Sequence, residues 1–295
     1  MGRSMNTPSK QKRRRLPPWL TRRITAGRRA DDVAALLRDL NLATVCDEAR
    51  CPNRHECFCR GTATFMILGR SCTRRCRFCA VSDGAPEPLR DDEPDAVATA
   101  AARMGLRHVV ITSVTRDDLP DGGAAHFART VAAVRERLPD AAVEVLVPDF
   151  QGDRDAIATV LAAEPDVFNH NVETVPRLYP QVRPQAEYAR SIDVLAVAAR
   201  AGATVKSGLM AGLGETMTEV DAVLGDLRAA GCGILTVGQY LAPSDAHVPV
   251  ARYVPPAEFD ALKARAEAMG FAAVAAGPFV RSSYNAESVY RSASR

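Results

Sequence analysis

Short apolar runs alternate with helical patterns along the chain from residue 62 onward. The six strand-like runs lie at 62–68, 107–113, 142–147, 166–170, 203–210 and 234–240. These runs are continuously apolar rather than alternating, which is typical of strands that are covered on both faces. Helical patterns follow them at 93–104, 123–138, 153–163, 186–201, 216–230 and 256–269.

Six successive β–α units predict a parallel sheet with helices on its outside. A closed barrel of this type needs eight units, so we expect an α/β fold with an open, partial (β/α)6 TIM-type barrel. A doubly wound sheet is the alternative that periodicity does not exclude. The predicted organisation is a basic flexible arm at 1–16, an N-terminal extension at 17–60, the barrel at 61–275 and a C-terminal extension at 276–295. We expect the two extensions to cover the barrel.

The charge of the chain is unevenly distributed. The net charge is +3, yet the first 29 residues contain ten Lys or Arg and no acidic residue. The remainder holds 28 basic and 35 acidic residues, a net charge of −7. The arm is therefore expected to be solvated, and the acidic body argues against nucleic-acid binding. The chain has no run of about 18 apolar residues and no apolar export signal, so we expect no membrane span and a cytoplasmic location.

Three cysteines follow the first predicted strand, where βα barrels place their chemistry. Cys72, Cys76 and Cys79 lie on a loop that also carries four arginines, and this positive charge is expected to lower the thiol pKa values. A structural zinc site normally has four protein ligands, and an electron-carrying [4Fe–4S] cluster has four cysteines. Three thiolates would leave one metal position open to a small molecule. A zinc knuckle is the alternative.

A second cysteine triplet precedes the predicted barrel. Cys46, Cys51 and Cys57 again provide three thiolates, and His55 is the nearest candidate for a fourth ligand. The spacing is compatible with a second iron–sulfur cluster or with a zinc site. The pattern of residues alone does not choose between them.

The first triplet, with Phe78 before its last cysteine, resembles that of the radical S-adenosylmethionine (SAM) superfamily. The resemblance implies a [4Fe–4S] cluster on Cys72, Cys76 and Cys79 whose open iron binds the amino and carboxylate groups of SAM. One electron then cleaves SAM to methionine and a 5′-deoxyadenosyl radical.

The rest of the chain resembles the lipoyl synthase family, from about Pro17 to about Glu287. The matching segments are VCDEARCPN (45–53), ITSVTRDDLPDGGAAHF (111–127), FNHNVETV (168–175), KSGLMAGLGE (206–215), GQYLAPS (238–244) and GPFVRSSYNAE (277–287). The joint spacing of two cysteine triplets and a terminal RSSY motif is highly specific.

This resemblance implies roles for individual residues. The triplet Cys46, Cys51 and Cys57 would hold an auxiliary [4Fe–4S] cluster together with a serine of the RSSY motif. We assign that ligand role to Ser283, with Ser282 as the alternative.

Asn171 and Glu173, at the end of the fourth predicted strand, are candidates for binding the ribose hydroxyls or amino group of SAM; helix capping is the alternative. Arg183 and Lys206 are weaker candidates for contacting a carboxylate of substrate or SAM. Asp117 is expected only to cap a loop, and His247 to be an ordinary loop residue.

The implied reaction is sulfur insertion at C6 and C8 of a protein-bound octanoyl-lysine, with the auxiliary cluster as sulfur donor. The implied partners are octanoylated lipoyl carrier domains, the glycine cleavage H protein, a flavodoxin- or ferredoxin-like one-electron reductant and an iron–sulfur carrier that rebuilds the cluster. A methylthiotransferase would need a further tRNA-binding domain, for which no residues remain. A non-catalytic iron–sulfur or zinc protein whose arm binds nucleic acid is the alternative from another class.

Overall fold

The strands form one open, mostly parallel sheet. The computed structural model describes residues 16–21 and 28–293. Strands β1 to β8 lie in chain order, and neighbours from β2 to β8 pair in parallel, whereas β1 is antiparallel to β2. Their bounds are Ala43–Thr44, Thr64–Ile67, His108–Ser113, Ala142–Leu146, Val167–Asn169, Val205–Ala211, Ile234–Gln239 and Ala273–Gly277. Among the described residues β8 does not pair with β1, so the predicted partial barrel is confirmed.

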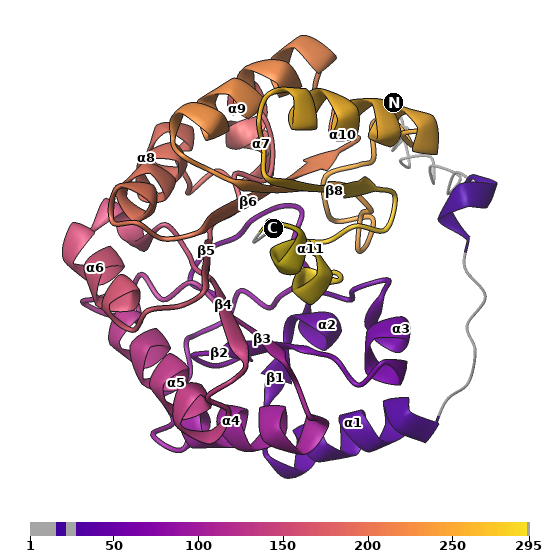
Figure 1. Ribbon diagram of the computed structural model, residues 1–295. Helices are drawn as coiled ribbons and strands as arrows, with labels where there is room; N and C mark the ends of the chain where they lie inside the picture. Colours follow the sequence, from indigo (N-terminus) through magenta and orange to yellow (C-terminus); the bar gives the residue numbers. More distant parts are fainter. Residues whose placement is uncertain (1–15, 22–27, 294–295) are drawn as a thin grey trace, which may run out of the picture.

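Helices surround the sheet on its outer face (Figure 1). Those of the barrel are α4 Glu93–Met104, α5 Ala124–Arg137, α6 Arg154–Ala162, α8 Tyr188–Arg200, α9 Met217–Ala229 and α10 Pro256–Ala268, with the short α7 Tyr179–Val182 before α8. Local signals set their ends. Thr216 and Glu219 form a reciprocal capping box at the start of α9, and Gly105 ends α4 in the left-handed conformation.

Strand β8 is an addition to the six predicted strands. Those six agree with β2 to β7 to within a few residues, but β8 was missed and crosses the predicted boundary at residue 276. Its sequence, AVAAG, is mostly alanine and glycine, which are depleted in strands. Pairing with β7 provides the stabilisation that its composition does not indicate.

The two extensions lie on the side where β1 and β8 leave the barrel open (Figure 1). The N-terminal extension forms α1 Arg28–Asp39, α2 Val45–Glu48 and α3 Arg54–Cys59, and the C-terminal one ends in α11 Ala286–Ala293. Helix α11 is seen within the outline of the ring in Figure 1 and packs against β3, β7 and β8. Close approach requires Gly238 on β7, because a Cβ atom there would lie 2.0 Å from the carbonyl oxygen of Val280.

Most of the predicted arm, residues 1–15, lies outside the described residues. Among the helices that are described, none has the length and apolar character needed to cross a membrane.

Candidate active site and metal centres

The two cysteine triplets lie at opposite ends of strand β2. Cys46 follows β1, whose Thr44 pairs with Phe65 near the start of β2. Cys72 comes five residues after the last residue of β2. Because β2 has four residues, it spans about 13 Å at the usual rise of a parallel strand. One short strand therefore separates the two groups of thiols.

The loop that carries Cys72 is fixed by backbone hydrogen bonds. The Cys72 N–H donates to the carbonyl of Ser82 over 2.8 Å, which closes the loop on itself. The Thr73 N–H donates to the carbonyl of Thr115, in the loop after β3, over 3.0 Å. The Thr115 N–H in turn donates to the Cys72 Sγ atom over 3.3 Å. The first cysteine is thus positioned by the end of its own loop and by the loop after β3.

The second half of the same loop is fixed from the opposite side of the barrel. The Arg77 N–H donates to the carbonyl of Val182 over 2.8 Å, and the Arg77 carbonyl accepts from the Val248 N–H over 2.9 Å. His247 Nε2 lies 2.9 Å from the carbonyl oxygen of Cys79, to which it can donate. His247 is therefore more than an ordinary loop residue, because it supports the last cysteine of the triplet.

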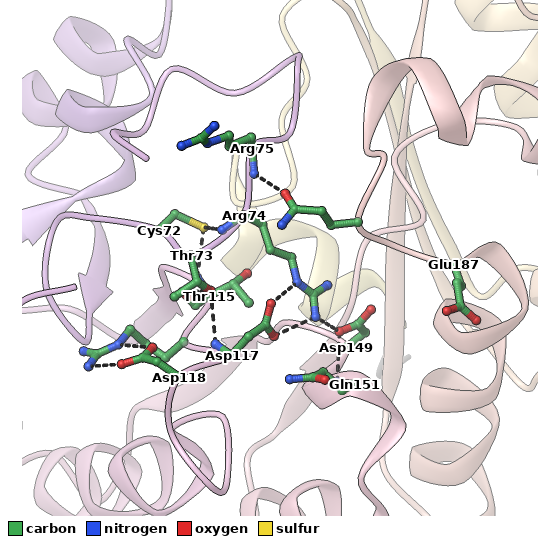
Figure 2. A network of polar contacts seen from close by, with 12 residues as sticks. Cys72, Thr73, Arg74, Arg75, Thr115, Asp117, Asp118, Asp149, Gln151 and Glu187 are labelled. Carbon is green, nitrogen blue, oxygen red and sulfur yellow. Dashed lines mark hydrogen bonds and ion pairs between the residues drawn. The ribbon is translucent and has the colours of Figure 1, made fainter. Parts of the chain in front are cut away.

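A buried arginine clamps the cysteine loop to the loops after β3 and β4 (Figure 2). Arg74 donates to both carboxylate oxygens of Asp117, over 2.6 and 2.8 Å, and to Asp149 over 2.7 Å. Burial alone would raise the pKa of Asp149, but Arg74 outweighs this and lowers it to about 2. Asp117 therefore holds the cysteine loop in place rather than merely capping its own loop. In contrast to Arg74, the next residue, Arg75, has a side chain that is 76% exposed.

The thiols of the first triplet are half-buried and close enough to influence one another's pKa. Burial raises the pKa of Cys76 to about 11, although the guanidinium of Arg183 acts in the opposite direction. Burial likewise raises the pKa of Cys79 to about 12, and the other two thiols of the triplet raise it further. The prediction that the loop arginines lower these pKa values is wrong, because the loss of solvation outweighs their charge.

Asn171 and Glu173 lie beside this triplet. Asn171 Nδ2 donates to Glu173 Oε1 over 3.2 Å, and Arg183 donates to the Asn171 carbonyl over 2.9 Å. Glu173 has a left-handed backbone with φ of 67°, and it forms an isolated bridge with Leu209 on β6. Its carboxylate contributes to the raised pKa of both Cys76 and Cys79, which places its charge near their thiols. Asn171 and Glu173 can therefore contact a polar group of a ligand that is bound at the cysteine loop.

Two cysteines of the second triplet line a cavity that also includes Ser283 in its lining. Cys46 on α2, Cys57 on α3 and Ser283 from the C-terminal extension share a cavity of about 500 Å³. Burial raises the pKa of Cys46 to about 12 and that of Cys57 to about 11, and the nearby Cys51 raises both. The fold thus brings three thiols from one end of the chain to a hydroxyl from the other.

The hydroxyl of the neighbouring Ser282 is hydrogen-bonded to residues of the barrel. Ser282 Oγ accepts a hydrogen bond from Asn169 Nδ2 over 2.8 Å and donates to Asn171 Oδ1 over 3.1 Å. These contacts point the Ser282 hydroxyl into the barrel, whereas Ser283 faces the cysteine cavity. The two serines of the motif therefore have different surroundings.

Comparison with known proteins identifies the family. The radical SAM superfamily profile matches residues 66–227, and the profile for the N-terminal domain of lipoyl synthase matches residues 3–51. The lipoyl synthase of Oleidesulfovibrio alaskensis is 58% identical over 272 residues, covering 92% of this chain and 94% of the relative. That of Rubrobacter xylanophilus is 55% identical over 283 residues, covering 95% and 88%. The chain belongs to the lipoyl synthase family.

Solved structures show the same fold at low sequence identity. HydG, a maturase of the [FeFe]-hydrogenase, aligns with a TM-score of 0.58 and 14% identity over 82% of this chain and 64% of that protein. Methylornithine synthase (PylB) aligns with a TM-score of 0.53 and 15% identity, covering 77% and 68%. These similarities support the partial-barrel fold of the chain.

The donor sets of this lipoyl synthase family member fit iron–sulfur clusters. Among the described residues, no three cysteine, histidine or carboxylate side chains are arranged around a single ion. A cubane cluster makes a different demand, because each thiolate binds a separate iron atom. Each triplet provides three neighbouring thiols whose charges influence one another, and the second has the hydroxyl of Ser283 in the same cavity.

Lys206, a candidate for carboxylate binding, is engaged inside the barrel. Its Nζ atom lies 2.7 and 3.0 Å from the two carboxylate oxygens of Glu144, and both side chains are only 1% exposed. Burial alone would raise the pKa of Glu144, but Lys206 and then His108 outweigh it and lower the pKa to about 2. Glu144 also accepts from Asn169, which holds Ser282. Lys206 thus supports the C-terminal extension rather than a ligand carboxylate.

Sequence reasoning missed several supporting residues of the lipoyl synthase site. Arg74 and Asp149 are the clearest cases, together with Asn169. A polar residue in the loop after a predicted strand was the available signal for Asp149, but Arg74 is one of four arginines on its loop. Only the packing of the folded chain distinguishes the buried arginine from its exposed neighbour Arg75.

Proposed function

We propose that the protein inserts sulfur at C6 and C8 of an octanoyl chain that is amide-linked to a lysine of a carrier protein. The observation that carries the proposal is the pair of three-thiol sites at the two ends of β2, one of which shares its cavity with Ser283. When bound, the SAM-binding cluster would supply a radical oxidant for unactivated C–H bonds, and the auxiliary cluster would be the sulfur-donating substrate.

The residues of the first site would hold and shield the cluster. Cys72, Cys76 and Cys79 would bind three irons as thiolates and leave the fourth to SAM. Asn171 and Glu173 lie beside this triplet and are suited to binding polar groups of SAM. The Arg74 clamp would support this site from outside. Preorganised support of this kind keeps a reactive site rigid and excludes water.

The residues of the second site would hold a cluster that is consumed. Cys46, Cys51 and Cys57 would provide thiolates, and Ser283 the fourth ligand. Ser283 is favoured over Ser282 because the Ser282 hydroxyl already accepts from Asn169 and donates to Asn171. A hard alkoxide suits iron less well than a thiolate does, so it suits a site that must release its sulfur.

The proposed substrates are octanoylated lipoyl carrier domains, including the glycine cleavage H protein. A flavodoxin- or ferredoxin-like protein would supply single electrons, and an iron–sulfur carrier would rebuild the auxiliary cluster. We place the reaction in the cytoplasm, where thiols stay reduced, in keeping with eight free cysteines.

The proposal is tested with anaerobic protein filled at both sites, dithionite, SAM and an octanoyl-lysyl peptide. We expect 5′-deoxyadenosine and a peptide that has gained two sulfur atoms, measured by mass spectrometry. The peptide is a dithiol with no net change in hydrogen under the reductant, and it loses two hydrogens when it is oxidised to the cyclic disulfide. A peptide that remains unchanged while SAM is cleaved, or that gains a methylthio group, would contradict it.

The serine assignment has a matched pair of variants. Ser283→Ala should abolish sulfur insertion while SAM cleavage continues, because the auxiliary cluster loses its oxygen ligand. Ser282→Ala should retain insertion at a reduced rate, because it removes hydrogen bonds to Asn169 and Asn171 that position the segment. The reverse ranking would transfer the ligand role to Ser282.

A further inference from the structure

The cavity of the second triplet opens at the end of the barrel that lies away from the Cys72 loop. Its lining includes Thr64 and His108, the first residues of β2 and β3. The Cys72 loop instead follows the last residue of β2. The Cys46 site can therefore be reached from outside without passing the first triplet.

Four arginines surround this cavity. Arg29, Arg60, Arg107 and Arg291 all belong to its lining and are exposed, whereas Glu287 is the one carboxylate among the described lining residues. Glu56, which lies outside the lining, pairs with Arg60 over 2.8 Å, so the four arginines still outnumber the nearby carboxylates. The guanidinium of Arg29 lies directly over Gly61, where a Cβ atom would meet it. Helix α11 begins at Ala286, also in the lining, and its N-terminal end adds partial positive charge. The mouth of the cavity is therefore positive on an otherwise acidic body.

The rim already binds a carboxylate. Glu287 accepts from Arg107 over 3.0 Å and from Arg291 over 2.8 Å. The side chains of these arginines are 72% and 59% exposed, so each retains N–H groups that face solvent. Arginine recognises carboxylates with its planar fork, and this geometry suits an acidic protein surface.

We propose that this arginine rim is the docking surface for an acidic protein that carries an iron–sulfur cluster and refills the Cys46–Cys51–Cys57 site. The inference rests on the proposed function, in which each product removes two sulfur atoms from that site. Iron and sulfide must then be supplied before the next turnover. A mouth at the far end of β2 allows this while the first cluster stays in place.

The transfer balances without a redox partner. The incoming cluster leaves the thiolates of its carrier, which take up protons. It binds Cys46, Cys51, Cys57 and Ser283, which release theirs, and no electron is exchanged. The positive rim favours this step, because a cluster held by three thiolates and an alkoxide carries net negative charge.

The octanoylated carrier is less well suited to this mouth. An octanoyl chain requires a mainly apolar channel. The lining of this cavity is mixed, because it includes the apolar Met104, Leu106 and Val110 but also four arginines. The observations therefore favour the cluster carrier, and docking of the octanoylated carrier becomes an outcome of the test.

The test uses the double variant Arg107→Glu/Arg291→Glu and a matched control. Arg154 and Arg200 form the same arrangement elsewhere, since both pair with the single carboxylate Asp193 and both side chains are 62% exposed. The control is therefore Arg154→Glu/Arg200→Glu. A milder variant, Arg107→Gln/Arg291→Gln, retains the test if charge reversal impairs folding.

Each protein is first depleted at the second site by one turnover, and then offered either an acidic carrier protein loaded with a [4Fe–4S] cluster or ferrous iron with sulfide. Recovery is followed by iron content and visible absorbance. With the carrier, the rim variant should recover at least about tenfold more slowly than wild type, and the wild-type rate should fall with salt. The rim variant should recover from free iron and sulfide and cleave SAM at the wild-type rates. The control variant should behave like wild type in every assay.

Three results would overturn the proposal. The rim variant could recover its second site from the carrier at the wild-type rate, or it could recover equally slowly from free iron and sulfide. The fully loaded rim variant could also show a raised KM for the octanoylated carrier. A wild-type protein that loses no iron during turnover would instead contradict the proposed function, before any variant is compared.

Discussion

The two cysteine triplets provide the same number of thiols in contrasting surroundings. The Cys72–Cys79 loop is hydrogen-bonded to three other segments and clamped by the buried Arg74. Cys46 and Cys57 lie on two short helices beside a cavity of about 500 Å³ with a positive mouth. The comparison teaches that ligand count does not determine the fate of a cluster. On the proposed function, the first setting would retain its cluster and the second would allow its cluster to be replaced.

The largest effect should come from removing one ligand at each site. Cys72→Ala should abolish SAM cleavage and therefore sulfur insertion. Cys51→Ala should abolish insertion only, because it belongs to the other triplet. The assay measures 5′-deoxyadenosine and lipoyl peptide in parallel. Equal loss of both products in the two variants would remove the distinction between the sites.

The clamp predicts a large effect on stability that is confined to one site. Arg74→Met leaves Asp149 buried without its main partner, so the free energy of unfolding should fall by about 3 kcal/mol. Iron bound at the Cys72 loop should also decrease, measured in a Cys51→Ala background that lacks the second cluster.

Arg75→Met is the matched control on the same loop. Arg75 and its partner Asp83 are 76% and 54% exposed, so their pair should contribute less than about 1 kcal/mol. Equal effects of the two substitutions would show that the arginine network does not position the loop.

Acid should weaken the link between the barrel and the C-terminal extension. Glu144, with its pKa lowered to about 2, stabilises the fold fully above its ordinary pKa near 4.5, and that contribution is lost as the pH falls toward 2. The loss should be on the order of 3 kcal/mol, measured by denaturant unfolding of the metal-free protein.

Glu144→Gln should flatten this pH dependence. The exposed pair Lys263–Glu267 provides the control, because its side chains are 48% and 52% exposed. If Glu267→Gln flattens the curve as much as Glu144→Gln does, the buried pair is not the cause.

The smallest expected effect concerns His247. His247→Phe removes its hydrogen bond to the Cys79 carbonyl and should cost about 1 kcal/mol. Hydrogen exchange at the Val248 amide, which donates to Arg77, should accelerate about fivefold. Refilling of the second site should not change, and a slowed refilling would mean that the two sites are coupled.

The six central strands could be predicted from the sequence because they are apolar on both faces. The two-residue β1 and β8 could not, since the alanines of β8 become a strand only through pairing with β7. Both cysteine triplets could be recognised from their spacing as candidate metal ligands, since their members lie close together in the chain, whereas the choice of an iron–sulfur cluster rested on the family resemblance.

Contacts between distant segments could not be predicted in the same way. The different surroundings of Ser282 and Ser283 depend on Asn169 and on the cysteine cavity, which only the folded chain brings together. The thiol pKa values were also misjudged, because charge is visible in a sequence and burial is not.

Iron and product counted together after a single turnover test the division of roles most directly. Protein filled at both sites is given SAM, reductant and octanoyl-lysyl peptide without any iron source. The account predicts about one lipoyl group per chain, a loss of about four of eight irons and continued SAM cleavage. Several lipoyl groups per chain with no loss of iron, or loss of SAM cleavage together with the iron, would contradict it.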